Sequence, residues 1–197
     1  MKIEAHNLSR SFAGRAAIDA LSFLWPKGSA QLVLGPNAAG KSTLLAMISG
    51  LMHPTSGSIY LNGAPARAAS SRIGLGAFVP GELPRRRTPR QLLDAVAGIP
   101  HWDRLQLSSL IDRRVGTLSS GQQARVRLGL ALGMGTELLL LDEPLSTLDR
   151  PSSNAAVEAV IHAHSLGTTV VIATHLPERW TDLCAAPFPM LAGRRAP

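Results

Sequence analysis

The segment from Gly35 to Ser42 holds residues whose types and spacing suit the binding of a polyphosphate. It reads Gly-Pro-Asn-Ala-Ala-Gly-Lys-Ser and fits the G-x-x-x-x-G-K-[ST] pattern of a phosphate-binding loop. Glycines let backbone N–H groups approach an anion closely, and Lys41 adds a positive charge. The Ser42 hydroxyl is a suitable Mg²⁺ ligand. We therefore expect nucleotide phosphates to contact Gly35, Pro36, Asn37, Ala38, Ala39, Gly40, Lys41, Ser42 and Thr43.

Two adjacent acids, Asp142 and Glu143, follow a run of four leucines. Such a run is typical of a strand buried in a parallel sheet, and open α/β sheets bind ligands at the carboxyl ends of their strands. Asp142 is therefore placed to hold Mg²⁺, directly or through water. Glu143 is placed to polarise a water toward the terminal phosphate, as a general base would. Taken alone, these residues could equally be an ordinary strand with a charged exit.

The flanking residues predict the elements that position these groups. The apolar run 31–34 predicts a buried strand before the loop. Residues 43–49 predict a helix after it, whose positive N-terminal end would face the phosphates. Leu-Ser-Ser-Gly-Gln at 118–122 predicts another helix start, with Ser119 or Ser120 as the cap. This start is either an anion site or a plain capped helix.

Composition narrows the class of protein. The chain has 197 residues, of which 45% are hydrophobic and 17% charged, as expected for one sizeable α/β domain. Because the beginning lacks an apolar signal region and Cys184 is the single cysteine, we expect a protein of the reducing cytosol. The net charge of +7 is compatible with nucleic acid, anionic lipid or nucleotide, but the aromatic content of 4% does not favour base-stacking platforms.

The order of the motifs resembles the nucleotide-binding subunit of ATP-binding cassette (ABC) proteins. The phosphate loop is followed by Leu-Ser-Ser-Gly-Gln, Leu-Leu-Leu-Leu-Asp-Glu-Pro, Ser-Thr-Leu-Asp and Thr-His. The resemblance covers about residues 3 to 193. It implies an α/β fold with a P-loop NTPase core and a mostly parallel sheet, an N-terminal antiparallel β subdomain and a short helical subdomain. The implied organisation is one nucleotide-binding domain over 1–197, with the helical subdomain at about 84–130.

The resemblance also implies ATP hydrolysis with Mg²⁺ in a site shared by two chains. The catalytic residues would be Glu143, Lys41 and His175, which resembles the family's switch histidine. One chain would supply Phe12, the aromatic that stacks on adenine, while the facing chain would supply Ser119 and Gly121. The implied nucleotide-binding set also includes Ser120, Gln122 and Asp149. Of these three, Asp149 would lie at the dimer seam.

The partners implied by the resemblance are a second nucleotide-binding subunit, in a homo- or heterodimer, and an integral membrane subunit. The chain would be cytoplasmic and peripheral on the inner face of the cell membrane, and no nucleic acid is expected. One alternative is a slow or degenerate cassette of a heterodimeric pair. The other is a soluble ABC ATPase without a transport role, although the long coiled coil of the DNA-repair members does not fit between Ser42 and Leu118.

Two positions depart from the family pattern. Ser120 replaces the first glycine of the usual Leu-Ser-Gly-Gly-Gln signature. Gly81 stands where the family usually has a glutamine that ligates Mg²⁺, and the neighbouring Glu82 could reach the metal instead. The second departure puts metal-coupled signalling in doubt more than ATP binding.

Three further segments carry structural expectations. Thr88 and Pro89 predict a helix start, and Leu105 to Ile111 suggests a second helix. Arg85, Arg86 and Arg87 form either a solvated basic loop or a contact for an acidic partner or phospholipid headgroups. Near the end of the chain, residues 188–191 are expected to form one edge strand.

Overall fold

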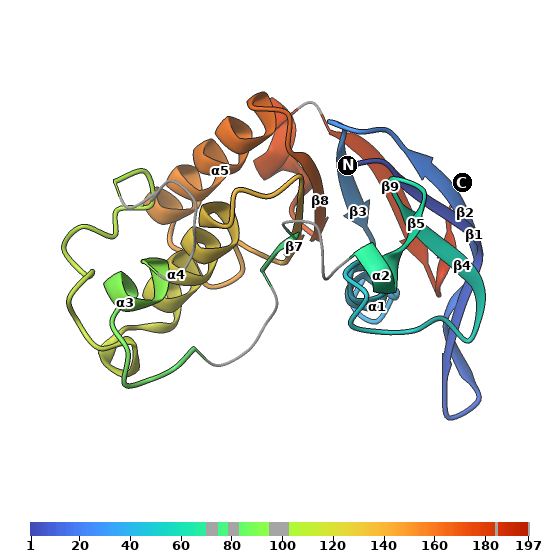
Figure 1. The fold of residues 1–197 in the computed structure, drawn as a ribbon, viewed down its shortest axis with the longest axis horizontal. Coiled ribbons are helices and arrows are strands. Elements are labelled where there is room, and N and C mark those ends of the chain that lie inside the picture. The colour runs from blue at the N-terminus through green and yellow to red at the C-terminus, as the bar shows by residue number, and fades with distance from the viewer. Residues whose placement is uncertain (70–74, 79–82, 95–102, 184, 197) are drawn as a thin grey trace.

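The computed structural model describes residues 1–69, 75–78, 83–94, 103–183 and 185–196, with the backbone alone described at 68–69 and 75–78. Within these ranges the chain forms two β-sheets, with helices between and beside them (Figure 1). The expected fold class is confirmed: a mostly parallel sheet is joined to an N-terminal antiparallel sheet.

The antiparallel sheet has the strand order β2-β1-β4-β5. It is built from β1 (Ile3–Phe12), β2 (Arg15–Trp25), β4 (Ser56–Leu61) and β5 (Ala64–Pro65). The short helix α2 (Ala66–Ala69) follows β5.

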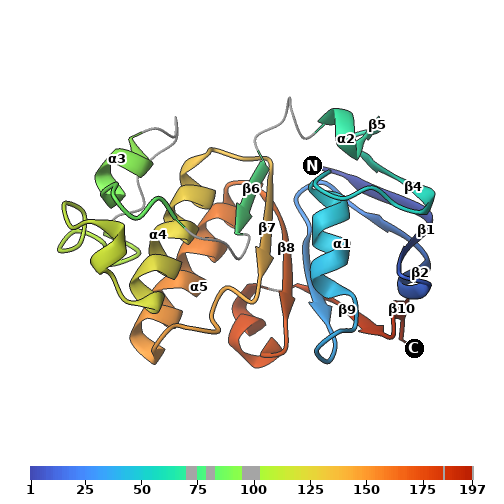
Figure 2. The same cartoon turned by 90° about the horizontal axis from the view of Figure 1, so that it is seen from below.

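The second sheet has the order β10-β9-β3-β8-β7-β6, and all its pairings are parallel except that of β10 with β9. Its strands are β3 (Ala30–Leu34), β6 (Leu75–Phe78), β7 (Leu138–Asp142), β8 (Thr169–Thr174), β9 (Ala186–Leu191) and β10 (Arg194–Arg195). Figure 2 shows α1 (Lys41–Ile48) on one side of this sheet, and α4 (Ser120–Gly133) and α5 (Arg150–Ser165) on the other. The remaining helices are α3 (Pro89–Leu93) and two 3-10 segments, η1 (Val115–Thr117) and η2 (Pro177–Leu183).

The interior strand β7, between β8 and β6, is buried on both faces. Leu139 and Leu141 pack in the hydrophobic cluster that includes α4 and α5, while Leu138 and Leu140 pack in the cluster around α1. Alternation of side chains along a strand sends neighbours to opposite faces, so an unbroken apolar run is what a doubly covered strand requires. The expected buried strand before the two acids is therefore present.

The helix expected at Leu105 to Ile111 is absent, because this segment forms turns. Its leucines are buried against α4, but Gln106 has a left-handed φ of 53°. In addition, the carbonyls of Leu105 and Gln106 accept hydrogen bonds from the Arg125 guanidinium at 3.2 and 3.1 Å. These two carbonyls are thus satisfied by a side chain of α4 and not by the N–H groups of a helix.

The other local expectations have mixed outcomes. Thr88 caps α3 in a capping box with Gln91, and Pro89 is the first helical residue, as predicted. The strand expected near residues 188–191 exists as β9, but it is not at the edge. It pairs with β3 on one side, and the two-residue β10 occupies the edge.

No helix in the described ranges is long and apolar enough to span a bilayer.

We predict that Leu139→Ala and Leu140→Ala each lower the free energy of unfolding by about 2–5 kcal/mol, because both side chains are enclosed although they point to opposite faces. Urea titration followed by circular dichroism would measure this. Leu166→Ala is the control, since Leu166 is 71% exposed, and it should change stability by less than about 0.5 kcal/mol. A large effect from only one of the two buried leucines would contradict the double coverage of β7.

Candidate nucleotide-binding site

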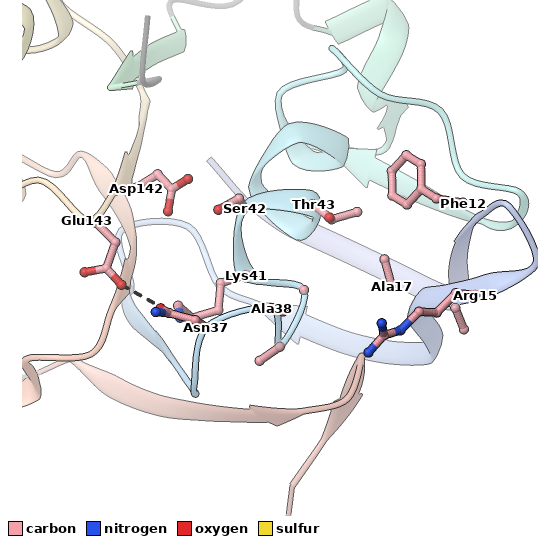
Figure 3. Close-up of a pocket in the computed structure, with 13 residues that line it drawn as sticks. Phe12, Arg15, Ala17, Asn37, Ala38, Lys41, Ser42, Thr43, Asp142 and Glu143 are labelled. Atoms are coloured by element: carbon pink, nitrogen blue, oxygen red, sulfur yellow. Dashed lines mark ion pairs between the residues drawn. The ribbon is translucent and has the colours of Figure 1, made fainter.

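A cavity of about 410 Å³ lies between the β1–β2 hairpin, the loop before α1 and the end of β7 (Figure 3). Figure 3 shows Phe12 and Arg15 at one end, and Asp142 and Glu143 at the other. The phosphate-loop residues and the two acids after β7, about one hundred residues apart in the sequence, thus line the same cavity. Its lining consists of Phe12, Arg15, Ala16, Ala17, Asn37, Ala38, Ala39, Gly40, Lys41, Ser42, Thr43, Asp142 and Glu143.

The loop from Gly35 to Gly40 is held so tightly that its glycines are sterically required. A Cβ at Gly40 would lie 2.3 Å from the carbonyl oxygen of Ala17, and φ there is 99°. A Cβ at Gly35 would lie 2.3 Å from the carbonyl oxygen of Met190. The backbone of β2 and of β9 therefore packs directly against the loop, and only glycine permits this approach.

Lys41 is the first residue of α1, and only 6% of it is exposed. Its ammonium donates hydrogen bonds to the carbonyl oxygens of Gly35, at 2.8 Å, and Pro36, at 3.1 Å. It also lies 3.8 Å from a carboxylate oxygen of Glu143. These acceptors hold one positive charge at the mouth of the loop, where the N-terminus of α1 adds its own positive potential.

Glu143 follows β7 in a left-handed turn, with φ of 47°. Its N–H donates to the carbonyl of Ala173, and its carboxylate is hydrogen-bonded to Nδ1 of His175 at 2.8 Å. His175 follows β8 directly, so the parallel pairing of β7 with β8 brings the two side chains together. The sequence predicted both residues separately, and the hydrogen bond between them is new.

Asp142 and Ser42 supply the oxygen donors that Mg²⁺ prefers. Both line the cavity, and Figure 3 shows the Asp142 carboxylate directed toward the Ser42 hydroxyl. In the described part of the chain, no group of three or more His, Cys, Asp or Glu residues is gathered as a metal site. This donor set fits an ion that takes few protein ligands and completes its shell with phosphate and water oxygens, as Mg²⁺ commonly does.

At the other end of the cavity, Phe12 is 43% exposed and carries the Arg10 guanidinium 4.7 Å from its ring centroid. Arg10 also donates to the carbonyl of His53. This cation–π contact restrains the ring while leaving it accessible.

Arg15 is a cavity residue that the sequence analysis missed. Within the described residues, no ion pair or hydrogen bond occupies its exposed guanidinium. Figure 3 shows it directed from β2 toward the loop at Ala38. The clue in the sequence was weak, namely one basic residue three positions after Phe12 across a Gly-containing turn.

The Leu-Ser-Ser-Gly-Gln segment does not line this cavity. Ser119 caps α4, with its hydroxyl accepting from the N–H of Gln122, and Gln122 accepts from the N–H of Ser119. Gly121 lies against the 146–149 segment, where an added Cβ would be 2.8 Å from the carbonyl of Thr147. Ser119, Ser120, Gly121 and Gln122 are thus grouped beside the segment that ends in Asp149, apart from the cavity lining.

Asp149 caps α5 by accepting a hydrogen bond from the N–H of Ser152 at 2.9 Å. Hydrogen bonding from the Ser152 side chain, and then from its backbone, holds the pKa of the Asp149 carboxyl below its ordinary value. Gly81 and Glu82, the positions of the expected metal-ligating glutamine and its neighbour, lie outside the described residues.

Comparison with known proteins gives consistent results. Residues 18–146 match the family model described as ABC transporter. The Nod factor export ATP-binding protein I of Sinorhizobium fredii is 36% identical over 92% of this chain and 58% of its own length. The linearmycin resistance ATP-binding protein of Bacillus subtilis is 31% identical over 92% of this chain and 64% of its own. The chain therefore spans about three fifths of these two relatives.

Two solved structures share the fold. A nucleotide-free ATP-binding cassette from an ABC transporter superposes with a TM-score of 0.84 at 22% identity, covering 100% of this chain and 90% of its own. A cassette dimer in a post-hydrolysis state, bound to ADP and Pi, has a TM-score of 0.88 at 20% identity, covering 99% and 97%.

We predict that Asp149→Ala destabilises the chain at pH 7 and that this difference from wild type shrinks in acid. Because the folded pKa is depressed, the ionised cap contributes stability above the ordinary aspartate pKa of about 3.9, and the contribution is lost as the pH falls through the folded value. Urea unfolding of both proteins between pH 7 and about pH 3 would measure it. Glu158→Ala controls for loss of one carboxyl from the same helix. A difference that stays constant with pH would rule out this account of the cap.

Proposed function

The chain belongs to the ABC transporter family as an ATP-binding ATPase subunit, and on that premise we propose that the cavity between Phe12 and Glu143 is its ATP site. The observation that carries the proposal is the junction of three segments in one place. The phosphate loop with Lys41, the acids at the end of β7, and His175 at the end of β8 converge at a single sheet edge.

The cavity volume of about 410 Å³ lies within the usual range of small-molecule sites, about 300–1,000 Å³. We propose that adenine stacks on the accessible ring of Phe12 and that the phosphates extend over the loop toward Lys41. The N–H groups at the start of α1 and the Lys41 ammonium would then oppose the charge of the phosphates. Gly35, Pro36, Asn37, Ala38, Ala39, Gly40, Ser42 and Thr43 form the rest of the proposed phosphate cradle.

Glu143 is the proposed general base. As the oxygen of an attacking water bonds to the γ-phosphorus, the bridging P–O bond to ADP breaks, and Glu143 accepts the proton of that water. His175 holds the Glu143 carboxylate through the 2.8 Å hydrogen bond and so acts in positioning this base. The left-handed turn at Glu143 directs its carboxylate into the cavity and away from the continuing chain.

We further propose Ser42 and Asp142 as the residues that hold Mg²⁺. When bound, the ion would supply positive charge that offsets the negative charge of the phosphates. The support is the oxygen chemistry of the two side chains and their placement in the same cavity.

A second chain would complete the site. Ser119, Ser120, Gly121 and Gln122 do not line the cavity of their own chain, so a role in nucleotide binding requires them to reach a nucleotide held by another copy. The capped N-terminus of the 14-residue helix α4 suits a phosphate, because its N–H groups and dipole favour an anion. Asp149 would lie at the seam between the chains. ATP would thus join two subunits, and hydrolysis would release them.

The transport partner is proposed as a separate integral membrane subunit. The chain would act at the cytoplasmic inner face of the cell membrane, bound to that subunit as a peripheral component. The support is the family and the naming of relatives such as the export ATP-binding protein described above.

The test of the proposal is ATP-dependent dimerisation of Glu143→Gln. This variant keeps the shape of the site but lowers base strength, so turnover should fall about 10²- to 10⁴-fold while ATP binding persists. Light scattering with Mg·ATP should then show a shift from monomer to dimer. Lys41→Ala is the control, which should neither bind ATP tightly nor dimerise. A Glu143→Gln protein that binds ATP but hydrolyses it at the wild-type rate would remove Glu143 from the role of base.

We also predict that Arg15 contacts the phosphate chain of the nucleotide, since its unpaired guanidinium points toward the loop. Arg15→Ala should weaken ATP and ADP binding about three- to tenfold, as expected for the loss of one hydrogen bond worth about 1 kcal/mol. Fluorescence titration with both nucleotides would measure this. Arg104→Ala, which removes an exposed arginine that does not line the cavity, should bind like wild type. Equal affinities for Arg15→Ala and wild type would exclude the contact.

A further inference from the structure

Five arginines from two separate segments lie side by side at the helical end of the molecule. The carbonyls of Arg85 and Arg87 accept hydrogen bonds from the N–H groups of Gly116, at 2.9 Å, and Val115, at 2.8 Å. The N–H of Arg90 likewise donates to the carbonyl of Ile111 at 3.0 Å. The two segments therefore run antiparallel and in contact. We call the exposed cluster that they form the arginine strip: Arg85, Arg86, Arg87, Arg113 and Arg114.

The arginine strip has no carboxylate partner within the described residues. The nearby Asp112 is engaged by Arg90 in a two-point ion pair, at 2.7 and 3.0 Å. Arg113 donates to the carbonyl of Thr117 at 3.3 Å, and the other four guanidinium groups of the strip form no hydrogen bond or ion pair there. The five guanidinium groups of the strip, which no carboxylate neutralises within the described residues, carry five positive charges, compared with a net charge of +7 for the whole chain.

This clustering is unfavourable for the isolated chain. Like charges closer together than the Debye length of about 8–10 Å repel one another. Arginine also presents a planar fork of donors that matches phosphate oxygens in pairs, which lysine cannot do. A cluster of exposed arginines, on two segments that are joined by backbone hydrogen bonds, is therefore suited to an external phosphate-bearing surface.

The neighbourhood of the strip favours a lipid surface over a protein. The exposed large hydrophobic side chains of the described residues are Phe12, Leu24, Leu51, Met134, Leu166 and Leu191. None of them lies in either segment of the strip. Stable protein interfaces have a buried apolar centre with aromatic or aliphatic anchors. A charged surface with no such anchor among the described residues fits the headgroups of a membrane, whose attraction for basic residues is electrostatic.

We propose that the arginine strip binds the phosphate groups of anionic phospholipids directly. This contact is independent of ATP and of the membrane subunit. It would hold the helical end of the chain against the membrane surface, whether or not the nucleotide site is occupied.

The experiment is sedimentation of the full chain with vesicles of phosphatidylcholine containing about 30% phosphatidylglycerol, without nucleotide, at about 0.1 M salt. One variant replaces Arg85, Arg86 and Arg87 with Gln, and a second replaces Arg113 and Arg114 with Gln. The matched control replaces three exposed basic residues elsewhere, Lys27, Arg150 and Arg195, with Gln and so removes as much charge as the first variant.

Wild type should bind these vesicles, but not vesicles of phosphatidylcholine alone. The first variant should bind at least about tenfold more weakly, the second should also be impaired, and the control should stay within about twofold of wild type. Equal losses in the first variant and the control would mean that net charge alone attracts the chain, and would overturn the proposal. So would wild-type failure to bind, or binding of poly-L-glutamate or duplex DNA through the strip in preference to the vesicles.

A second measurement uses the wild-type chain and does not depend on the folding of a variant. Phenylglyoxal modifies accessible arginines, and mass spectrometry locates the modified positions. Vesicles with phosphatidylglycerol should protect Arg85, Arg86, Arg87, Arg113 and Arg114 while leaving Arg150 reactive. Unchanged reactivity of the strip on bound protein would overturn the proposal.

Discussion

The parallel pairing of β3, β8 and β7 is the constraint on which the proposed site depends. Leu34 lies opposite Thr174, and Asp142 lies opposite Ala173. The three strands therefore end within one residue of the same level, and the residue that follows each of them emerges at the same edge of the sheet. Gly35, His175 and Glu143 are those residues. A shift of one residue in either register would turn the buried side chains to the opposite face, so the hydrophobic packing of the strands also fixes the geometry of the polar groups.

The site contains an unfavourable backbone conformation and a buried charge, and hydrogen bonds compensate for both. Glu143 adopts a left-handed conformation, which non-glycine residues seldom do, and the N–H bond to Ala173 extends the strand ladder across that turn. Lys41 is nearly buried, yet carbonyl oxygens of its own loop surround its ammonium. These compensating hydrogen bonds hold the charged groups in place without a ligand, so less ordering would be required for a nucleotide to bind at the proposed site.

Charged side chains are distributed differently at the two ends of the molecule. At the end that holds the proposed nucleotide site, cations and anions are interleaved, as in the contacts of Glu143 with Lys41 and His175. At the helical end, Arg90 is paired with Asp112, but the arginine strip is left without acids in the described part of the chain. The first arrangement suits a small, highly charged ligand that enters a cavity. The second suits an extended anionic surface, because its charges are spread along exposed turns.

The sequence alone was enough to predict the phosphate loop, the buried strand before Asp142, and the capped starts of α3 and α4. These features depend on contiguous residues, since loop geometry, strand burial and capping are set within a few positions. It did not determine the turns at Leu105, because a positive φ at Gln106 and the donors of Arg125 replace a helix. Only the tertiary structure joined His175 to Glu143, directed Arg15 into the cavity, and assembled the arginine strip from two segments. Each of these depends on which distant backbone segments pair, and pairing is decided by the packing of the whole chain and not by local spacing.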